Sequence, residues 1–284
     1  MSISRAPADI TPVLPPELER EIFLLTAQAY RGVSTRLMLV ASRVKTWLET
    51  FVYKTVVLRC PGHAFQFLYT LAKRPPQFAH SHIKALCIRP QIPLSVTTQL
   101  LTLCSGLETL ALWTHSQPEN PTDITNLLSS TPLTSLSINL HTITTNPTYY
   151  PPPALQHHPV FVNLTHLDIV NPWVVWTTSL GIEHLPRLTH LAFRFWSRGS
   201  VNAALSRILR ESPRLDCEDI RDIRVVVIQH TRDADEWKTI ERDAEGMWQR
   251  AERVVRWRRL TKAGPFDFPS DGHLSSLKPS FDLP

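Results

Sequence analysis

A six-residue pattern recurs five times between residues 83 and 193: an apolar residue, then leucine three positions later, then a second apolar residue two positions after the leucine. The central leucines are Leu86, Leu110, Leu136, Leu167 and Leu191, so the intervals are 24, 26, 31 and 24 residues. Periods of about 20–50 residues are typical of proteins built from one repeated structural unit. A single unit cannot bury its apolar face alone, so neighbouring units must stack. The pattern therefore predicts an α/β chain with neighbouring parallel strands.

The intervals resemble those of leucine-rich repeats, in which a short strand alternates with a helix or a looser segment. Such repeats commonly carry asparagine or cysteine three positions after the last apolar strand residue, and this chain has neither there. Those positions hold Gln91, His115, His141, Pro172 and Trp196. We therefore expect an irregular leucine-rich-repeat-like solenoid of parallel strands and helices over residues 59–230. Its longest interval includes a proline-rich insertion at 144–158, which we expect to be exposed.

Helical segments are expected between the strands, at residues 96–104, 123–129 and 201–209. Residues 223–228 (IRVVVI) predict a further strand, and residues 235–258 predict a long helix with a broad apolar stripe. We expect this C-terminal helix, within residues 231–262, to cap the last strand. Residues 263–284 contain four prolines and four serines, which favours a disordered tail, and residues 1–12 are expected to be flexible.

Glycine is scarce: the 284 residues include 8 glycines against 24 prolines, and no two glycines lie closer than eight positions. Phosphate-binding loops and the nucleophile elbow of hydrolases need glycines only a few positions apart, because only glycine permits so close a backbone approach. His166, Asp168 and His190 could form an acid–base or metal set, but no metal-ligand spacing such as His-Glu-x-x-His supports one. The sequence therefore predicts a chain that is not an enzyme and needs no cofactor or metal.

The net charge of +5 is small, and the basic residues of the C-terminal part are interleaved with acidic ones. A nucleic-acid-binding protein would show a patch of one sign, so we expect no nucleic-acid partner. No apolar stretch reaches the roughly 18 residues of a membrane span, and residues 1–30 lack the apolar core of a signal peptide. The four cysteines are dispersed, as in reduced cytosolic or nuclear proteins. We therefore expect a cytoplasmic or nuclear chain with no membrane partner.

Residues 13–58 predict three short helices followed by a strand. The first helix starts at Leu14-Pro15-Pro16-Glu17, where proline suits the first turn and acidic residues suit the positive end of the helix. Ser34-Thr35 can cap a second helix whose apolar residues run as far as Val44, and a third apolar face follows. The β-branched residues of Tyr53–Leu58 predict the strand.

Three stretches of this module resemble the F-box family. They are Leu14-Pro15-Pro16-Glu17-Leu18-Glu19-Arg20-Glu21-Ile22-Phe23, Leu39-Val40-Ala41-Ser42-Arg43-Val44-Lys45-Thr46-Trp47 and Tyr53-Lys54-Thr55-Val56. The resemblance implies a three-helix unit that docks on a Skp-type adaptor, which links it to a cullin-RING ubiquitin ligase. It also implies the adaptor-binding residues, which are Leu14, Pro15, Leu18, Ile22, Leu39 and Val40. A plain helical cap on the following domain is the alternative interpretation.

Side chains alternate between the two faces of a strand, so the neighbours of each central leucine lie on the face opposite the apolar core. This second face is small and polar at its centre, with tryptophans near the strand ends. Because Trp and Arg are enriched at interface hot spots, we predict a protein-binding surface there. Its residues are Arg89, Trp113, Asn139, His166, Asp168, His190, Arg194 and Trp196, with His166 beside His190. The alternative is that the tryptophans only pack against loops.

These features together predict the substrate-recognition subunit of an SCF-type ubiquitin ligase. Such a subunit is a non-catalytic adaptor, which would hold the Skp-type protein through its F-box-like module and an unknown protein substrate through its solenoid. A solenoid scaffold with no ligase association is the alternative function, because fold alone does not determine function.

Overall fold

The computed structural model describes residues 14–30, 32–114, 121–143, 155–170, 185–195, 225–229 and 247–263. The chain divides into two compact units, Met1–Lys54 and Thr55–Pro284, and each is described here by itself. Several expectations fall on residues outside the described ranges. They are the flexible N-terminus at 1–12, most of the insertion at 144–158, Trp196, the helix at 201–209, the first half of the C-terminal helix and the tail.

The first unit contains three helices, α1 (Pro16–Ala29), α2 (Ser34–Leu37) and α3 (Ser42–Lys54). Helix α1 begins where the sequence predicts, with Pro15 at the N-cap and glutamates in its first turn. The core of the unit is small. Its buried residues are Ala27, Val44 and Leu48, and its partly buried ones are Phe23, Leu24, Leu37, Met38, Ala41, Trp47 and Phe51.

Helix α2 is shorter than the sequence suggests, because the chain turns after Leu37. The amide of Leu39 donates to the carbonyl of Arg36 and that of Val40 to the carbonyl of Leu37, so both bonds span three residues instead of four. Val44, expected in the second helix, belongs to α3. Helix α3 runs on to Lys54, so the strand that follows begins at Thr55 and not at Tyr53.

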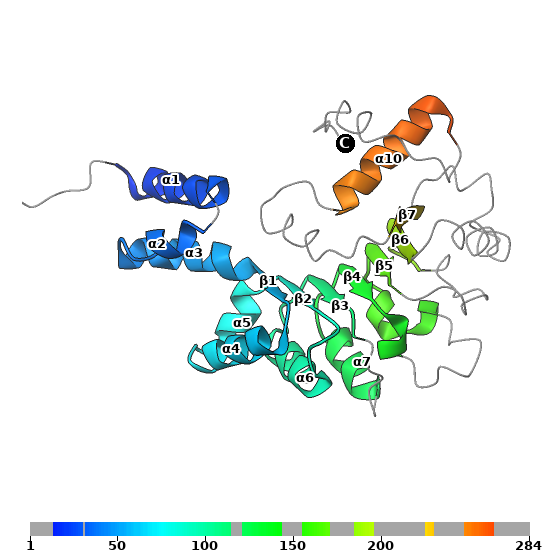
Figure 1. Cartoon of the computed structure of the whole chain (residues 1–284), viewed down its shortest axis with the longest axis horizontal. Helices are drawn as coiled ribbons and strands as arrows, with labels where there is room; N and C mark the ends of the chain where they lie inside the picture. The colour runs from blue at the N-terminus through cyan, green and yellow to red at the C-terminus, as the bar shows by residue number, and fades with distance from the viewer. Residues whose placement is uncertain are drawn as a thin grey trace, which may run out of the picture. The chain divides into compact units, whose positions relative to one another are not determined.

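The second unit is built on one sheet of parallel strands that lie side by side in chain order (Figure 1). The strands are β1 (Thr55–Leu58), β2 (Ala85–Ile88), β3 (Thr109–Leu112), β4 (Ser135–Ile138), β5 (His166–Ile169), β6 (His190–Phe195) and β7 (Val225–Gln229). The five central leucines pair with one another across β2 to β6, which confirms the register that the repeat predicts. The second unit is therefore a mixed α/β structure.

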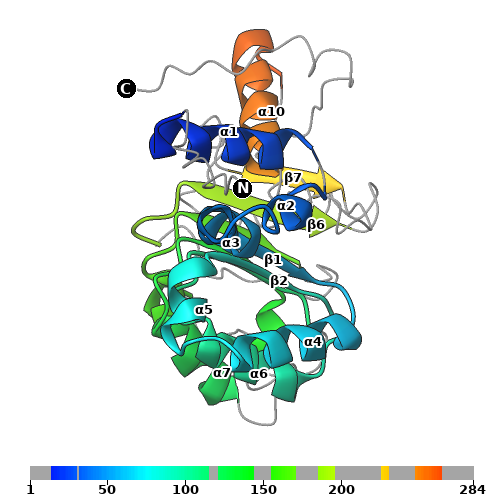
Figure 2. The same ribbon diagram turned by 90° about the vertical axis from the view of Figure 1, so that its left-hand side faces the viewer.

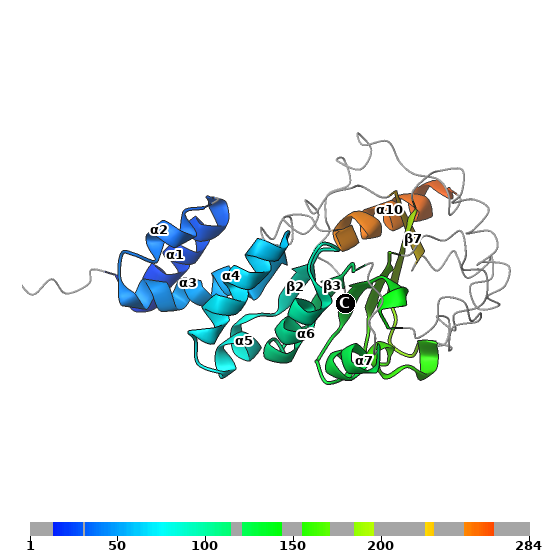
Figure 3. The ribbon, with the colours of Figure 1, turned by 60° about the horizontal axis from the view of Figure 1, so that its bottom comes forward.

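Helices cover the leucine side of this sheet (Figure 2). They are α4 (Pro61–Ala72), α5 (Gln77–His82), α6 (Leu94–Leu103) and α7 (Pro121–Ser129), which lie beside successive strands across the sheet (Figure 3). The sequence predicted α6 and α7, whereas α4 and α5 were missed. Between β4 and β5, the described residues contain the short 3-10 turns η1 (Leu140–Thr142), η2 (Leu155–His157) and η3 (Pro159–Phe161).

The apolar core of the second unit lies between the sheet and these helices. Each strand from β2 to β5 contributes its central leucine and the apolar residue two positions later, all essentially inaccessible to solvent. Leu100, Ile124 and Phe161 are buried on the helical side. The last helix, α10 (Met247–Thr261), lies on the opposite side of the sheet (Figure 2). Within the described residues, no helix combines the length and apolar character needed to cross a membrane.

Threonines placed just before the strands hold their starts together. The hydroxyl of Thr134 donates to the carbonyl of Glu108, that of Thr165 to the carbonyl of Thr134, and that of Thr189 to the carbonyl of Thr165. Each of these three carbonyls also accepts two backbone amides from the next strand's start, at 2.8–3.1 Å. Three donors therefore converge on each carbonyl. This threonine ladder satisfies backbone groups at the strand starts.

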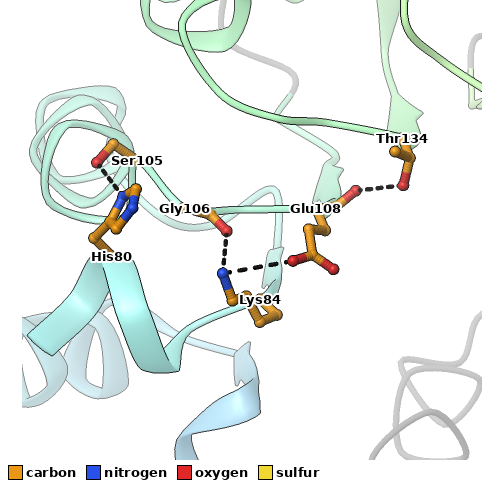
Figure 4. A network of polar contacts seen from close by, with 6 residues as sticks. All are labelled: His80, Lys84, Ser105, Gly106, Glu108 and Thr134. Atoms are coloured by element: carbon orange, nitrogen blue, oxygen red, sulfur yellow. Dashed lines mark hydrogen bonds and ion pairs between the residues drawn. The ribbon is translucent and has the colours of Figure 1, made fainter.

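Charged and polar side chains hold the loop that precedes β3 (Figure 4). Lys84 Nζ lies 3.5 Å from Glu108 Oε1 and donates to the Gly106 carbonyl at 3.4 Å. Next to Gly106, the hydroxyl of Ser105 lies 3.2 Å from Nδ1 of His80, near the end of α5. These contacts fix the loop between α6 and β3 against α5.

Gly106 is required by this close approach. A Cβ atom at residue 106 would lie 2.0 Å from the backbone carbonyl oxygen of His80, and backbone cannot move aside as a side chain can. We expect Gly106→Ala to lower the free energy of unfolding by about 1–3 kcal/mol, as overpacking does in other cores. Urea denaturation followed by circular dichroism measures the change.

Gly62→Ala is the matched control. The nearest atom to its added Cβ is the Cys60 Sγ at 4.0 Å, and alanine favours the helix that contains it. This variant should be at least as stable as the parent protein. Equal stability of the two alanine variants would contradict the close approach at Gly106.

Candidate functional site

The first unit exposes apolar side chains over its small core. Leu14, Leu18, Ile22, Leu39 and Val40 have 45%, 53%, 51%, 86% and 64% of their surfaces exposed. Pro15 is exposed as well. These are the six residues that the F-box resemblance assigns to adaptor binding, and all six are accessible in this unit. Exposed apolar residues gathered in one small unit are typical of an interaction surface.

Helix α1 has two apolar faces, of which one packs in the core of the unit and the other is exposed to solvent. Phe23, Leu24 and Ala27 pack toward α3, and so Leu18 and Ile22 point to the solvent. A bidentate contact keeps this orientation, because Arg43 at the start of α3 donates from Nε and Nη2 to the two carboxylate oxygens of Glu19, at 3.0 and 2.8 Å. Glu19 follows Leu18 in α1, and Arg43 comes three residues after Val40, so the contact links the segments next to both.

The Glu19–Arg43 contact also shifts the ionisation of both groups. The hydrogen bond from Arg43 lowers the pKa of the Glu19 carboxyl, and the same bond raises the pKa of the Arg43 guanidinium. Both groups therefore stay charged near neutral pH. Protonation of Glu19 in acid would remove the partner of Arg43 and weaken the link between the starts of α1 and α3.

The second face of the sheet in the second unit is not open to solvent at its centre, contrary to the sequence expectation. Ala85, Cys87 and Ala111 are buried in a small apolar cluster, against which Val57 and Trp113 pack. The residues that follow along this face are polar but also buried: Ser137, Asn139 and Asp168. Small side chains allow such close packing over a sheet.

A chain of hydrogen bonds crosses three strands on this face. The indole Nε1 of Trp113 donates to the Ser137 hydroxyl at 2.7 Å, and that hydroxyl donates to Oδ2 of Asp168 at 2.6 Å. A hydroxyl has one proton, so Ser137 must accept from Trp113 while it donates to the carboxylate. Asp168 has no exposed surface, so this chain of hydrogen bonds ends in a buried carboxylate.

Three of the predicted partner-binding residues follow consecutive strands. The amides of Arg89, Trp113 and Asn139 each donate to a carbonyl in the preceding strand, which places the three residues in one row at the strand ends. Arg89 and Trp113 are partly exposed, whereas Asn139 is 4% exposed. Arg89 and Trp113 are therefore the members of this row that a partner could reach.

His166 and His190 are paired across β5 and β6, as the sequence predicts. Their rings stack with centroids 4.2 Å apart and 7° between the planes. Trp248 of α10 stands edge-on to both rings, with centroids 4.9 Å from His166 and 5.8 Å from His190. Oε1 of Glu252, one turn further along α10, lies 3.4 Å from Nε2 of His190.

The threonine ladder determines which nitrogen of each imidazole carries the proton. Nδ1 of His166 lies 2.8 Å from the Thr165 hydroxyl, and Nδ1 of His190 lies 2.8 Å from the Thr189 hydroxyl. Both hydroxyls already donate to carbonyls, so each must accept from an Nδ1–H group. In the neutral rings, Nε2 is then unprotonated, and His190 pairs with Glu252 as an ion pair only when it is protonated.

Burial lowers the pKa of His166 to about 4, and the charge of His190 adds to this effect. His166 is therefore neutral near pH 7. Two parallel rings with in-plane lone pairs do not converge on one point, and the described residues contain no group of three His, Cys, Asp or Glu side chains that could hold a metal ion.

For two of the predicted partner-binding residues, Arg194 and Trp196, the structure does not describe the side chain. Arg194 lies in β6, where its backbone pairs with Ile228, and its side chain is outside the described part of the chain. Trp196 lies outside the described residues. Three residues of the site were not predicted from the sequence: Ser137, Trp248 and Glu252. Alternation along β4 placed Ser137 on the second face, but nothing local indicated its bond to Asp168.

No family model matches the chain, and a search of curated proteins finds no match.

Removal of the Ser137 hydroxyl should destabilise the second unit. Ser137→Ala takes away a donor to a buried carboxylate and the acceptor of the Trp113 indole, and hydrogen bonds to charged groups contribute about 1.5–3 kcal/mol. We expect a loss of about 2 kcal/mol in the free energy of unfolding, measured by urea denaturation.

The control is Ser135→Ala on the same strand, at a partly exposed position. A surface change of this kind should alter stability by no more than about 0.5 kcal/mol. If both variants lose the same free energy of unfolding, the hydrogen bonds between Trp113, Ser137 and Asp168 do not stabilise the fold.

The pKa of His166 makes stability depend on pH. Between its ordinary value of 6.5 and about 4, the unfolded chain binds a proton at His166 that the folded chain does not. The free energy of unfolding therefore falls as pH falls through this window. His166→Gln should make the fall smaller, by roughly 1 kcal/mol after allowance for the part of the ring that solvent screens.

Thermal unfolding between pH 7 and pH 4.5 tests this expectation. His63→Gln is the control, because His63 is exposed on α4. The same pH dependence in all three proteins would show that burial does not keep His166 neutral.

Proposed function

We propose that this protein is a substrate-recognition subunit of an SCF-type ubiquitin ligase. Its first unit, an F-box-like module, binds a Skp-type adaptor, and its second unit, a leucine-rich-repeat-like solenoid, presents a protein substrate to the ligase. The observation that carries the proposal is the exposure of Leu14, Leu18, Ile22, Leu39 and Val40. In a unit whose core is as small as Ala27, Val44 and Leu48, so much exposed apolar surface favours a protein partner.

The contact between α1 and α3 supports the same proposal. The contact joins the start of α1, which carries Leu18, to the start of α3, which follows the turn at Leu39–Val40. A rigid surface loses less entropy on binding than one that must first be ordered. The F-box resemblance names the same residues from the sequence.

The second unit supports the substrate-binding half of the proposal. Stacked strand–helix units create extended surfaces along the sheet, and proteins of this kind commonly use them for binding. Arg89, Trp113 and His190 are partly exposed on the second face and offer a cation, an indole and an imidazole to a partner. Asp168 and Asn139 are buried and would act through their neighbours. The proposed role is binding without catalysis.

The test is co-purification with a Skp-type adaptor. We expect the full-length protein to bind a purified adaptor and the double variant Leu39→Asp, Val40→Asp to bind at least tenfold more weakly. These two side chains are among the most exposed apolar ones in the unit, so charges there should leave the fold intact, which circular dichroism checks.

Phe65→Asp is the matched control. Phe65 is 55% exposed on α4 of the second unit, so this variant introduces a charge on an exposed apolar residue outside the module. It should bind the adaptor as the parent protein does. If the parent protein binds no Skp-type adaptor, the ligase proposal fails and the scaffold alternative remains.

A further inference from the structure

Two arginines follow neighbouring strands of the sheet, at the ends opposite the threonine ladder. Arg59 comes directly after β1, and Arg89 comes directly after β2. Leu58 pairs with Ile88, so the register continued by one residue places Arg59 beside Arg89. Leu58 and Ile88 are buried on the leucine side, and side chains alternate along a strand, so both arginines belong to the second face. Neighbouring strands lie about 4.8 Å apart, so the two cations start from adjacent positions.

The backbone holds both residues in place. The amide of Arg89 donates to the Leu58 carbonyl at 3.3 Å, and the carbonyl of Arg89 accepts from the Ile92 amide at 3.1 Å. Arg59 lies between β1 and α4, and the next residue, Cys60, is the N-cap of that helix. Side chains anchored on ordered backbone leave less entropy to be lost when a partner binds.

Arg59 and Arg89 are both partly exposed, and within the described part of the chain neither side chain forms an ion pair or a hydrogen bond. Nε of Arg89 is buried without a hydrogen-bond partner, which is uncommon for a charged group. The described acidic side chains of the second unit lie elsewhere: Glu108 next to Lys84, Asp123 on α7, Asp168 next to Ser137 and Glu252 next to His190. Like charges on adjacent strands destabilise the free protein, and a negatively charged partner would remove this cost.

The next strand adds an aromatic side chain to the two arginines. Trp113 follows β3 as Arg89 follows β2, and its amide donates to the Ile88 carbonyl at 3.2 Å. The indole Nε1 is the polar atom of this side chain, and it donates to Ser137. The partly exposed remainder of the ring is hydrocarbon. The strand-end row of Arg59, Arg89 and Trp113 therefore offers two cations followed by an apolar surface.

We propose that the strand-end row binds an acidic segment of the protein partner, with two carboxylates at the arginines and a neighbouring apolar side chain at Trp113. A guanidinium and a carboxylate can form two parallel hydrogen bonds, which makes the contact directional as well as attractive. Two arginines are too few for a nucleic-acid backbone, whose binding proteins contact several phosphates. The inference rests on the proposed partner-binding role of the second unit, and it names the chemistry of that partner.

Fluorescence anisotropy of a short peptide tests this row in the full-length protein at low ionic strength. The probe contains the run Glu-Ala-Glu-Ala-Leu, with capped ends and an uncharged fluorophore. We expect saturable binding to the parent protein and at least about tenfold weaker binding to the double variant Arg59→Gln, Arg89→Gln, because the charge-assisted contacts are lost. The peptide Gln-Ala-Gln-Ala-Leu should be similarly weak, and Glu-Ala-Glu-Ala-Ser should bind about threefold more weakly, because it buries less apolar surface.

The matched control is the double variant Arg187→Gln, Lys73→Gln. Arg187 is exposed just before β6, at the end of the sheet with the threonine ladder, and Lys73 is exposed after α4. This variant loses the same net charge as the test variant and should bind the glutamate peptide as the parent protein does. Equal weakening in both double variants would mean that net charge alone attracts the peptide. That result, or no binding to the parent protein, would overturn the proposal.

A charge reversal separates loss of binding from loss of fold. The double variant Arg59→Glu, Arg89→Glu should bind Lys-Ala-Lys-Ala-Leu at least about fivefold more tightly than the parent protein does, a gain that unfolding does not produce. The absence of this gain would contradict the proposal. Binding of a phosphoserine peptide without binding of the glutamate peptide would show a phosphate site, and the proposed carboxylate partner would be wrong. None of these measurements involves the adaptor, so their failure is distinct from a failure of the ligase test.

Discussion

The second unit depends on the joining of very short strands at their starts. Strands β1 to β5 have four residues each, and a strand of this length is stable only when its neighbours hold it. Two backbone amides from the following strand reach the carbonyl before it, and from β4 onward a threonine hydroxyl joins them. This ladder aligns the central leucines, and the leucines then build the core against α4 to α7. The threonines also orient the imidazoles of His166 and His190, so one feature sets both the register and the chemistry of the second face.

The two faces of the sheet have different stability requirements. The leucine side is an aliphatic core, and its loss would unfold the unit. On the second face, Ser137 donates to Asp168 within the sheet, and Trp248 and Glu252 of α10 contact the histidine pair. The first unit has a small core of its own and exposes several apolar side chains.

Much of the fold could be predicted because the signals are local or periodic. The repeat predicted the order and register of β2 to β6, and proline with acidic residues predicted the start of α1. The pairing of His166 with His190 followed from register alone. Other features could not be predicted from local patterns. Helix α2 ends early because the chain turns at Leu37, and α4 lacks the spaced charges that mark the polar face of an amphipathic helix, although it begins with a proline as α1 does.

The sequence by itself determined which residues face the core, because a strand alternates its side chains and the leucines recur at near-even intervals. It also determined that the residues matching the adaptor-binding positions of the F-box family are apolar. Only the tertiary structure decided that Asp168 is buried, that Ser137 bridges it to Trp113 and that Trp248 and Glu252 stand over the histidine pair. The reason is distance along the chain. Ser137 lies 24 residues from Trp113 and 31 from Asp168, and α10 follows β6 by a long segment, so no local pattern records these contacts.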